Sequence, residues 1–135
     1  MEHQQVDILG FPFSISETFQ HRNTNKSQEE AFEDIVKITA LLKSDGRGLN
    51  VYFSMAFGNP YGEMWKWEDV DFWANRFHEI GIKNILLSDT TGTGTPEQIA
   101  LLFEKIPGKY PEIDFGAHFH NRYEASYPKL KAAYD

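Results

Sequence analysis

Two histidines near the carboxyl end of the chain have a spacing that could support metal chemistry. They lie in the stretch GAHFHN at 116–121, which ends an apolar, strand-like run beginning near Ile113. Alternate side chains of an extended strand share a face, so His118 and His120 are predicted to point the same way. Two imidazoles on one face at the mouth of a strand can converge on one divalent ion. On spacing alone, the alternative interpretation is two solvated histidines at a strand end.

Polar and ionisable residues follow the other apolar runs of the chain as well. At the carboxyl ends of the predicted strands, in chain order, the candidates are Ser16, Glu17, Ser54, Ser88, Asp89, Thr90, His118, His120 and Asn121. Parallel α/β folds bind ligands at this end of their strands, so these side chains are predicted to converge on one site. Asp89 is alternatively a turn residue that accepts hydrogen bonds from nearby N–H groups. Glu17 is either a carboxylate that supports the site or a solvated loop residue.

Four strand–helix units are predicted to position these residues. Apolar runs rich in β-forming residues predict strands at 6–11, at 49–57, at 84–89 and from about 113 to the histidines. Apolar residues at helical spacing predict helices at 28–43, 67–80, 96–106 and 127–134. The stretch 13–25 is predicted to be the loop that follows the first strand.

Signals at the helix ends support these assignments. The segments 27–30 and 95–98 have the capping-box pattern, in which a hydroxyl and a side chain three residues later satisfy free backbone donors. Gly81 is placed to cap the carboxyl end of the second helix. In the last helix, Lys129 and Lys131 are interpreted as an ordinary helix face.

The alternation of strands and helices predicts an α/β fold with a parallel sheet and right-handed crossovers. An open doubly wound sheet and part of a (βα)8 barrel both fit this order. A complete barrel needs roughly 200 residues or more, so four units in 135 residues would form about half of one. Because no linker or low-complexity tract interrupts the chain, residues 1–135 are expected to form a single partial-barrel domain.

The composition excludes several classes of function. A hydrophobic content of 41% with 15% aromatic residues indicates a packed globular protein. The net charge of −7 argues against binding to nucleic acid or to an anionic membrane surface. No apolar run approaches the roughly 18 residues of a membrane span, and the first residues do not resemble a signal peptide. The absence of cysteine fits a reducing compartment, so a cytoplasmic location is expected.

Four motifs carry a resemblance that covers essentially the whole chain. They are ISETF at 15–19, YFSMAFGNPY at 52–61, DTTGTGTP at 89–96 and HFHN at 118–121. In this order and spacing they resemble the hydroxymethylglutaryl-CoA lyase family, which belongs to the metal-dependent lyases and Claisen-type synthases built on a TIM (βα)8 barrel. The resemblance implies that the chain corresponds to about strands four to seven with their helices.

The resemblance also implies roles for individual residues. His118 and His120 match two histidine ligands of a catalytic Mg²⁺ or Mn²⁺, with a catalytic role for His118 as well. Asp89 matches an acidic catalytic residue close to the metal and the substrate. The candidate substrate contacts are Glu17, Ser54, Thr90 and Asn121.

The implied reaction cleaves 3-hydroxy-3-methylglutaryl-CoA to acetyl-CoA and acetoacetate, a step of acyl-CoA metabolism and leucine degradation. A base removes the proton of the substrate hydroxyl, and the carbon–carbon bond breaks to give a ketone and a thioester enolate. A condensing relative similar to isopropylmalate or homocitrate synthase is the alternative within the same superfamily.

Some functional residues of the family have no match in this chain. The family's Arg-Asp pair of the first strand, its Asn ligand and its catalytic Cys are missing, because no arginine here precedes an aspartate and there is no cysteine. We therefore expect a fragment that is inactive by itself, or a folded, non-catalytic half barrel. Its histidine pair is expected to prefer Zn²⁺ or Ni²⁺, since Mg²⁺ favours a full octahedron of oxygens. Unpaired sheet edges and an uncovered inner face favour a homo-oligomer.

Overall fold

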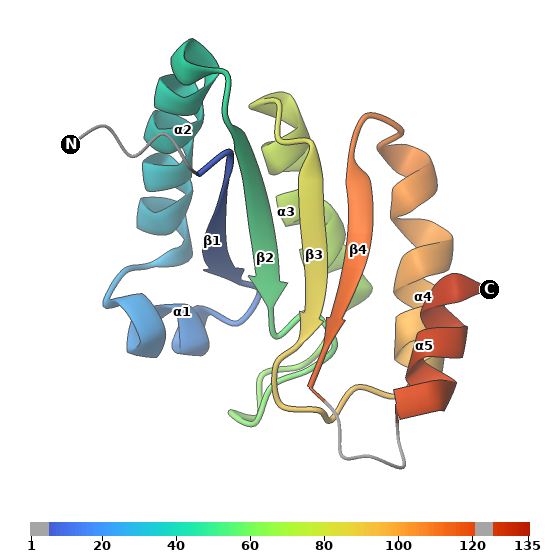
Figure 1. Cartoon of the computed structure of the whole chain (residues 1–135). Coiled ribbons are helices and arrows are strands. Elements are labelled where there is room, and N and C mark those ends of the chain that lie inside the picture. The colour runs from blue at the N-terminus through green and yellow to red at the C-terminus, as the bar shows by residue number, and fades with distance from the viewer. Residues whose placement is uncertain (1–5, 121–125) are drawn as a thin grey trace.

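The fold is built on one parallel sheet of four strands (Figure 1). The structure, a computed structural model, describes residues 6–120 and 126–135. The strands are β1 (Ile8–Ser14), β2 (Gly48–Ser54), β3 (Asn84–Asp89) and β4 (Asp114–Phe119). They lie side by side in chain order, and each neighbouring pair runs parallel. The predicted α/β class with a parallel sheet is confirmed.

The helices follow the strands as the apolar spacing predicts. They are α1 (Glu17–Thr24), α2 (Gln28–Asp45), α3 (Trp67–Glu79), α4 (Pro96–Lys105), the 3₁₀ helix η1 (Pro107–Lys109) and α5 (Ser126–Tyr134). Both predicted capping boxes form, at Ser27 and at Thr95. Gly81 ends α3 with a φ of 85°, which glycine adopts without strain. No helix in the described part of the chain is long and apolar enough to cross a bilayer.

The helices of residues 6–120 and 126–135 cover only one face of the sheet. Along β2, Val51 and Phe53 are fully buried, whereas Tyr52 and Ser54 on the opposite face are half-buried. Figure 1 shows α3 behind the middle strands and no helix in front of them. A doubly wound sheet changes its strand order and carries helices on both faces. Strands in chain order with helices on one face are the arrangement of a barrel segment.

Aromatic side chains join α2 and α3 to the covered face. The ring of Phe13 lies 4.6 Å from that of Trp73 and 5.0 Å from that of Phe77, measured between centroids. Phe32 of α2 meets Phe77 at 5.2 Å, and Phe53 of β2 meets it at 5.3 Å. Tilted and edge-on ring pairs of this kind stabilise a core beyond the area that they bury. This cluster packs β1 and β2, whose ends lead to Glu17 and Ser54, against α2 and α3.

The prediction of a loop at 13–25 was wrong, because α1 forms there. The hydroxyl of Ser16 accepts a hydrogen bond of 3.1 Å from the backbone N–H of Phe19 and so caps the helix. Gln20 is buried, and its side-chain oxygen accepts a hydrogen bond of 2.7 Å from the N–H of Ser14. The helix is mostly polar, so apolar spacing gave no signal for it. The first strand also runs further than predicted, to Ser14.

The second strand ends three residues earlier than predicted. Met55 has a φ of 58°, a left-handed conformation that is uncommon for a residue other than glycine. Its backbone N–H donates to the Thr90 hydroxyl at 2.9 Å. The apolar residues 55–57 continue the pattern of a strand but are buried in a turn, so composition alone placed them in β2.

Candidate functional site

The carboxyl end of β4 brings the two predicted metal ligands together. The Nε2 atoms of His118 and His120 lie 3.2 Å apart, and their ring planes meet at 70°. Both residues are exposed to solvent. The rings of Tyr52 and His118 are nearly perpendicular at a centroid distance of 5.9 Å, which places the pair on the uncovered face of the sheet. The predicted alternation of side chains along this strand is confirmed.

The separation of the two nitrogens fits two ligands of one ion. Imidazole nitrogens bind zinc at about 2.0–2.1 Å, so two of them around a single ion stand about 3.0–3.4 Å apart. The same separation fits a hydrogen bond between the rings, in which one nitrogen donates and the other accepts. Within residues 6–120 and 126–135, no group of three or more His, Cys, Asp or Glu side chains could hold an ion. The described residues therefore offer two possible ligands, His118 and His120, for one ion.

The carboxylate of Asp89 is occupied by partners other than the histidines. Its Oδ1 accepts a hydrogen bond of 3.0 Å from the N–H of Gly94, and its Oδ2 accepts one of 2.7 Å from the Nζ of Lys129. The residue is 2% exposed. The sheet register aligns Asp89 with Phe119, while His118 aligns with the preceding residue of β3. The Asp89 carboxylate therefore lies on the other side of the sheet from the His118 ring, in the hydrogen-bonding position of a turn aspartate.

The interpretation of Lys129 as part of an ordinary helix face was wrong. Its side chain is 5% exposed, and its Nζ donates to Asp89 and to the carbonyl oxygen of Gly92 at 2.8 Å. Lys131, two residues later, is exposed as expected. The helix α5 lies along α4 (Figure 1). Lys129 is buried, whereas the apolar Leu130 is 56% exposed. The signal in the sequence is the aspartate at the end of a buried strand, because a buried carboxylate needs a cation or hydrogen-bond donors beside it.

Ser54 and Thr90 lie at the same end of the sheet in different surroundings. Ser54 ends β2 on the sheet face that also carries His118. Thr90 is half-buried, and its hydroxyl accepts the hydrogen bond from Met55 that fixes the loop after β2. Asn121, the remaining predicted contact of this end, lies outside the described residues.

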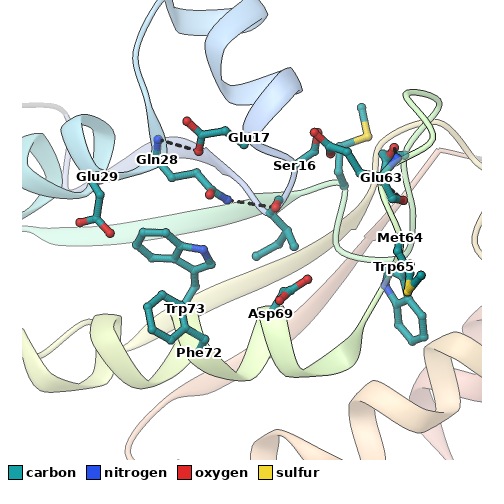
Figure 2. A pocket seen from close by; sticks show the side chains of 13 residues that line it. Ser16, Glu17, Gln28, Glu29, Glu63, Met64, Trp65, Asp69, Phe72 and Trp73 are labelled. Atoms are coloured by element: carbon teal, nitrogen blue, oxygen red, sulfur yellow. Dashed lines mark hydrogen bonds between the residues drawn. The ribbon is translucent and has the colours of Figure 1, made fainter.

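Glu17 lies in a pocket of its own, away from the histidines. Its Oε2 accepts a hydrogen bond of 3.2 Å from the N–H of Gln28 at the start of α2. Figure 2 shows the pocket, a cavity of about 430 Å³ to which the starts of α1, α2 and α3 contribute. No residue of β4 lines it. The structure therefore does not bring Glu17 together with the two histidines.

The pocket of Figure 2 is acidic and aromatic. Glu63 and Asp69 line it together with the rings of Trp65 and Trp73. Although burial raises the pKa of Glu63, hydrogen bonds from Ser16 and Thr18 bring it below its usual value. The backbone N–H of Thr18 donates to Glu63 at 3.1 Å. These contacts tie the loop after β2 to the start of α1.

Comparison with known proteins places these elements in a family. The HMGL-like family model matches residues 3–127. The chain is 31% identical over 129 residues to the cytoplasmic 3-hydroxy-3-methylglutaryl-CoA lyase of Danio rerio, an alignment that covers 96% of this chain and 38% of that protein. It is 30% identical over 120 residues to the hydroxymethylglutaryl-CoA lyase of Pseudomonas mevalonii, covering 89% of this chain and 40% of that one.

The three-dimensional comparison agrees. The crystal structure of hydroxymethylglutaryl-CoA lyase from Pseudomonas aeruginosa matches with a TM-score of 0.86 and 25% sequence identity, over 95% of this chain and 43% of that chain. The chain spans about two fifths of the length of the curated relatives named above. Its sheet and helices correspond to part of the TIM barrel of these enzymes. Because the family model covers nearly all of its residues, the chain belongs to the HMGL-like family, whose relatives named above are lyases.

Proposed function

We propose that this chain holds the histidine ligands of the metal site of a hydroxymethylglutaryl-CoA lyase. The reaction is cleavage of 3-hydroxy-3-methylglutaryl-CoA to acetyl-CoA and acetoacetate. The observation that carries the proposal is the 3.2 Å separation of the His118 and His120 Nε2 atoms at the end of a barrel strand, in a chain whose relatives are such lyases. The complete enzyme would use Mg²⁺ or Mn²⁺, and the pair by itself would take Zn²⁺ or Ni²⁺.

In the proposal, both histidines would bind the ion, and His118 would also take part in proton transfer. A divalent ion, when bound, lowers the pKa of a coordinated hydroxyl and orients the reacting oxygens. Each Nε2 has one lone pair, so His118 binds an ion or accepts the hydroxyl proton through that atom, but not both at once. With Nε2 bound to the ion, a catalytic proton transfer by His118 would have to use its other ring nitrogen, Nδ1.

The remaining predicted residues enter the proposal in different ways. Ser54 shares the sheet face of His118, which supports a contact with substrate. Thr90 supports the site through the loop after β2 that it fixes, whereas Glu17 and Asn121 stay predicted substrate contacts. A catalytic role for Asp89 stays a prediction too, and it would require Lys129 to give up its hydrogen bond to that carboxylate.

Cleavage is favoured over condensation because the relatives described above are named as lyases. The proposed small-molecule partner is an acyl-CoA, as in leucine degradation, and the proposed location is the cytoplasm. We also propose that residues 1–135 form one partial-barrel domain. Its uncovered sheet face and the exposed edge residues Ile8 and Leu9 support self-association.

Metal titration of the purified chain tests the histidine site directly. We expect Zn²⁺ to bind with one-to-one stoichiometry in calorimetry, and His118→Ala or His120→Ala to abolish this binding. His21→Ala is the matched control, because His21 is an exposed histidine on α1. Zinc binding that survives both substitutions at 118 and 120 would contradict the site.

An activity assay tests the second part of the proposal. The chain by itself is expected to release no measurable acetoacetate from 3-hydroxy-3-methylglutaryl-CoA, since no residue matches the family's Arg-Asp pair or its cysteine. Metal-dependent acetoacetate release by the purified 135-residue chain would overturn this expectation.

A further inference from the structure

Lys129 is a buried charged group for which the proposed function has no use. Its Nζ donates to the Asp89 Oδ2 at 2.7 Å and to the Gly92 carbonyl oxygen at 2.8 Å. The side chains of Lys129 and Asp89 are 5% and 2% exposed. One ammonium group therefore joins α5 to two points of the turn between β3 and α4.

The turn that Lys129 holds is in contact with His120. The carbonyl oxygen of Asp89 accepts hydrogen bonds from the N–H of Gly92 at 3.1 Å and from the N–H of His120 at 3.4 Å. Gly92 has a φ of 72°, and a Cβ added to it would lie 2.6 Å from the carbonyl oxygen of His120. The backbone of the turn is therefore packed directly against the residue whose ring meets His118.

The contacts form a continuous path from α5 to the histidine pair. The path runs from Lys129 through Asp89 and Gly92 to the backbone of His120, and from the His120 ring to that of His118. A buried ion pair often contributes little net stability compared with an apolar pair of the same shape. Its directional hydrogen bonds do fix the position of the groups that they join, and groups that orient metal ligands through hydrogen bonds affect metal affinity.

We propose that Lys129 is a positioning residue for the pair of His118 and His120. By holding the carboxylate of Asp89 and the carbonyl of Gly92, it sets the turn against which the backbone of His120 packs. It also neutralises the buried charge of Asp89. The effect on metal affinity rests on the proposed function, whereas the effect on the position of His120 stands independently of it.

Three variants test the role of Lys129. Lys129→Met removes the ammonium but leaves Asp89 buried and charged, which endangers folding. The double variant Lys129→Met with Asp89→Asn removes both charges and keeps an oxygen for the N–H of Gly94. Lys131→Met is the matched control, because it makes the same change two residues away on the same helix. Each variant is first shown to be folded by circular dichroism.

The readouts are the imidazole resonances of His118 and His120 in NMR spectra of the metal-free chain, and the dissociation constant for Zn²⁺. In the folded double variant, we expect the His120 ring resonances to shift and the zinc dissociation constant to rise about tenfold. Lys131→Met is expected to leave both unchanged. A double variant with a lower melting temperature but unchanged resonances and zinc affinity would overturn the proposal, because Lys129 would then only stabilise the fold.

The two proposals fail in distinguishable ways. If the unchanged chain binds no zinc, the metal site is contradicted, and the ring resonances alone decide the role of Lys129. If the unchanged chain binds zinc through the histidines and the double variant binds it equally well with unmoved rings, only the positioning role is contradicted.

Discussion

Two ionisable pairs stand at the carboxyl end of the sheet, and they differ in what holds them. His118 lies in β4 and His120 directly follows that strand; both are exposed, and their rings contact each other. Asp89 and Lys129 are 40 residues apart in the sequence, and both are buried. The exposed pair is open to a ligand from solvent, whereas each member of the buried pair already has partners. The comparison shows that one pair is placed to meet a ligand, whereas the other holds the turn beside it in position.

The largest difference between the two pairs is expected in stability. Lys129→Met leaves the Asp89 carboxylate buried without its cation, so we expect the free energy of unfolding to fall by about 3–5 kcal/mol. His118→Ala removes an exposed side chain and is expected to change it by less than about 0.5 kcal/mol. Urea unfolding followed by circular dichroism measures both. Equal losses for the two variants would contradict the distinction between a buried pair that stabilises the fold and an exposed pair that is open to a ligand.

A smaller effect is expected at the contact between the turn and His120. Gly92→Ala introduces a Cβ that would lie 2.6 Å from the His120 carbonyl oxygen, at a φ of 72°. Gly62 is the matched control, since its φ is 79° and its Cβ would meet no atom within 4 Å. Gly62→Ala is expected to cost about 1 kcal/mol from backbone strain alone, and Gly92→Ala about 1–3 kcal/mol more because of the close contact.

Thermal unfolding of the two alanine variants decides whether this contact is tight. The Gly92→Ala variant is also expected to shift the ring resonances of His120, whereas Gly62→Ala leaves them in place. Similar losses of stability and unmoved resonances in both variants would mean that Gly92 is not in tight contact with the carbonyl oxygen of His120.

The smallest effect is expected at Glu63, whose exposure lies between the two extremes. Its folded pKa is lower than its ordinary value, so its contribution to stability is present above the unfolded pKa and is lost as the pH falls through the folded pKa. The free energy of unfolding is expected to drop between about pH 6 and about pH 3. We expect this drop to be smaller in Glu63→Gln, by less than about 1 kcal/mol. Urea unfolding at both pH values measures it, and an unchanged pH dependence would show that Glu63 is not held by Ser16 and Thr18.

Local pattern was enough to predict the exposed pair and most elements. The period of two along β4 put His118 and His120 on one face, and the hydroxyl of Thr95 marked the start of α4. These features depend on residues within a few positions of one another. The resemblance of the motifs to a known family agreed with the barrel segment that the strand order then established.

The features that escaped prediction depend on long-range contacts or on rare backbone conformations. Lys129 looked like a surface lysine because its role needs Asp89, which only the fold brings near. Met55 looked like part of a strand, since a positive φ at a residue other than glycine leaves no mark in the sequence. The polar helix α1 lacked an apolar stripe, although Ser16 carried its cap.

The most direct test of the central claim is the X-ray absorption spectrum of the chain at one equivalent of zinc. If His118 and His120 bind the ion together, the fine structure will show two imidazole nitrogens at about 2.0–2.1 Å. The His120→Ala variant would then show one imidazole or no bound zinc. A spectrum of the unchanged chain without imidazole scattering, or one that the His120→Ala substitution does not alter, would contradict the histidine site.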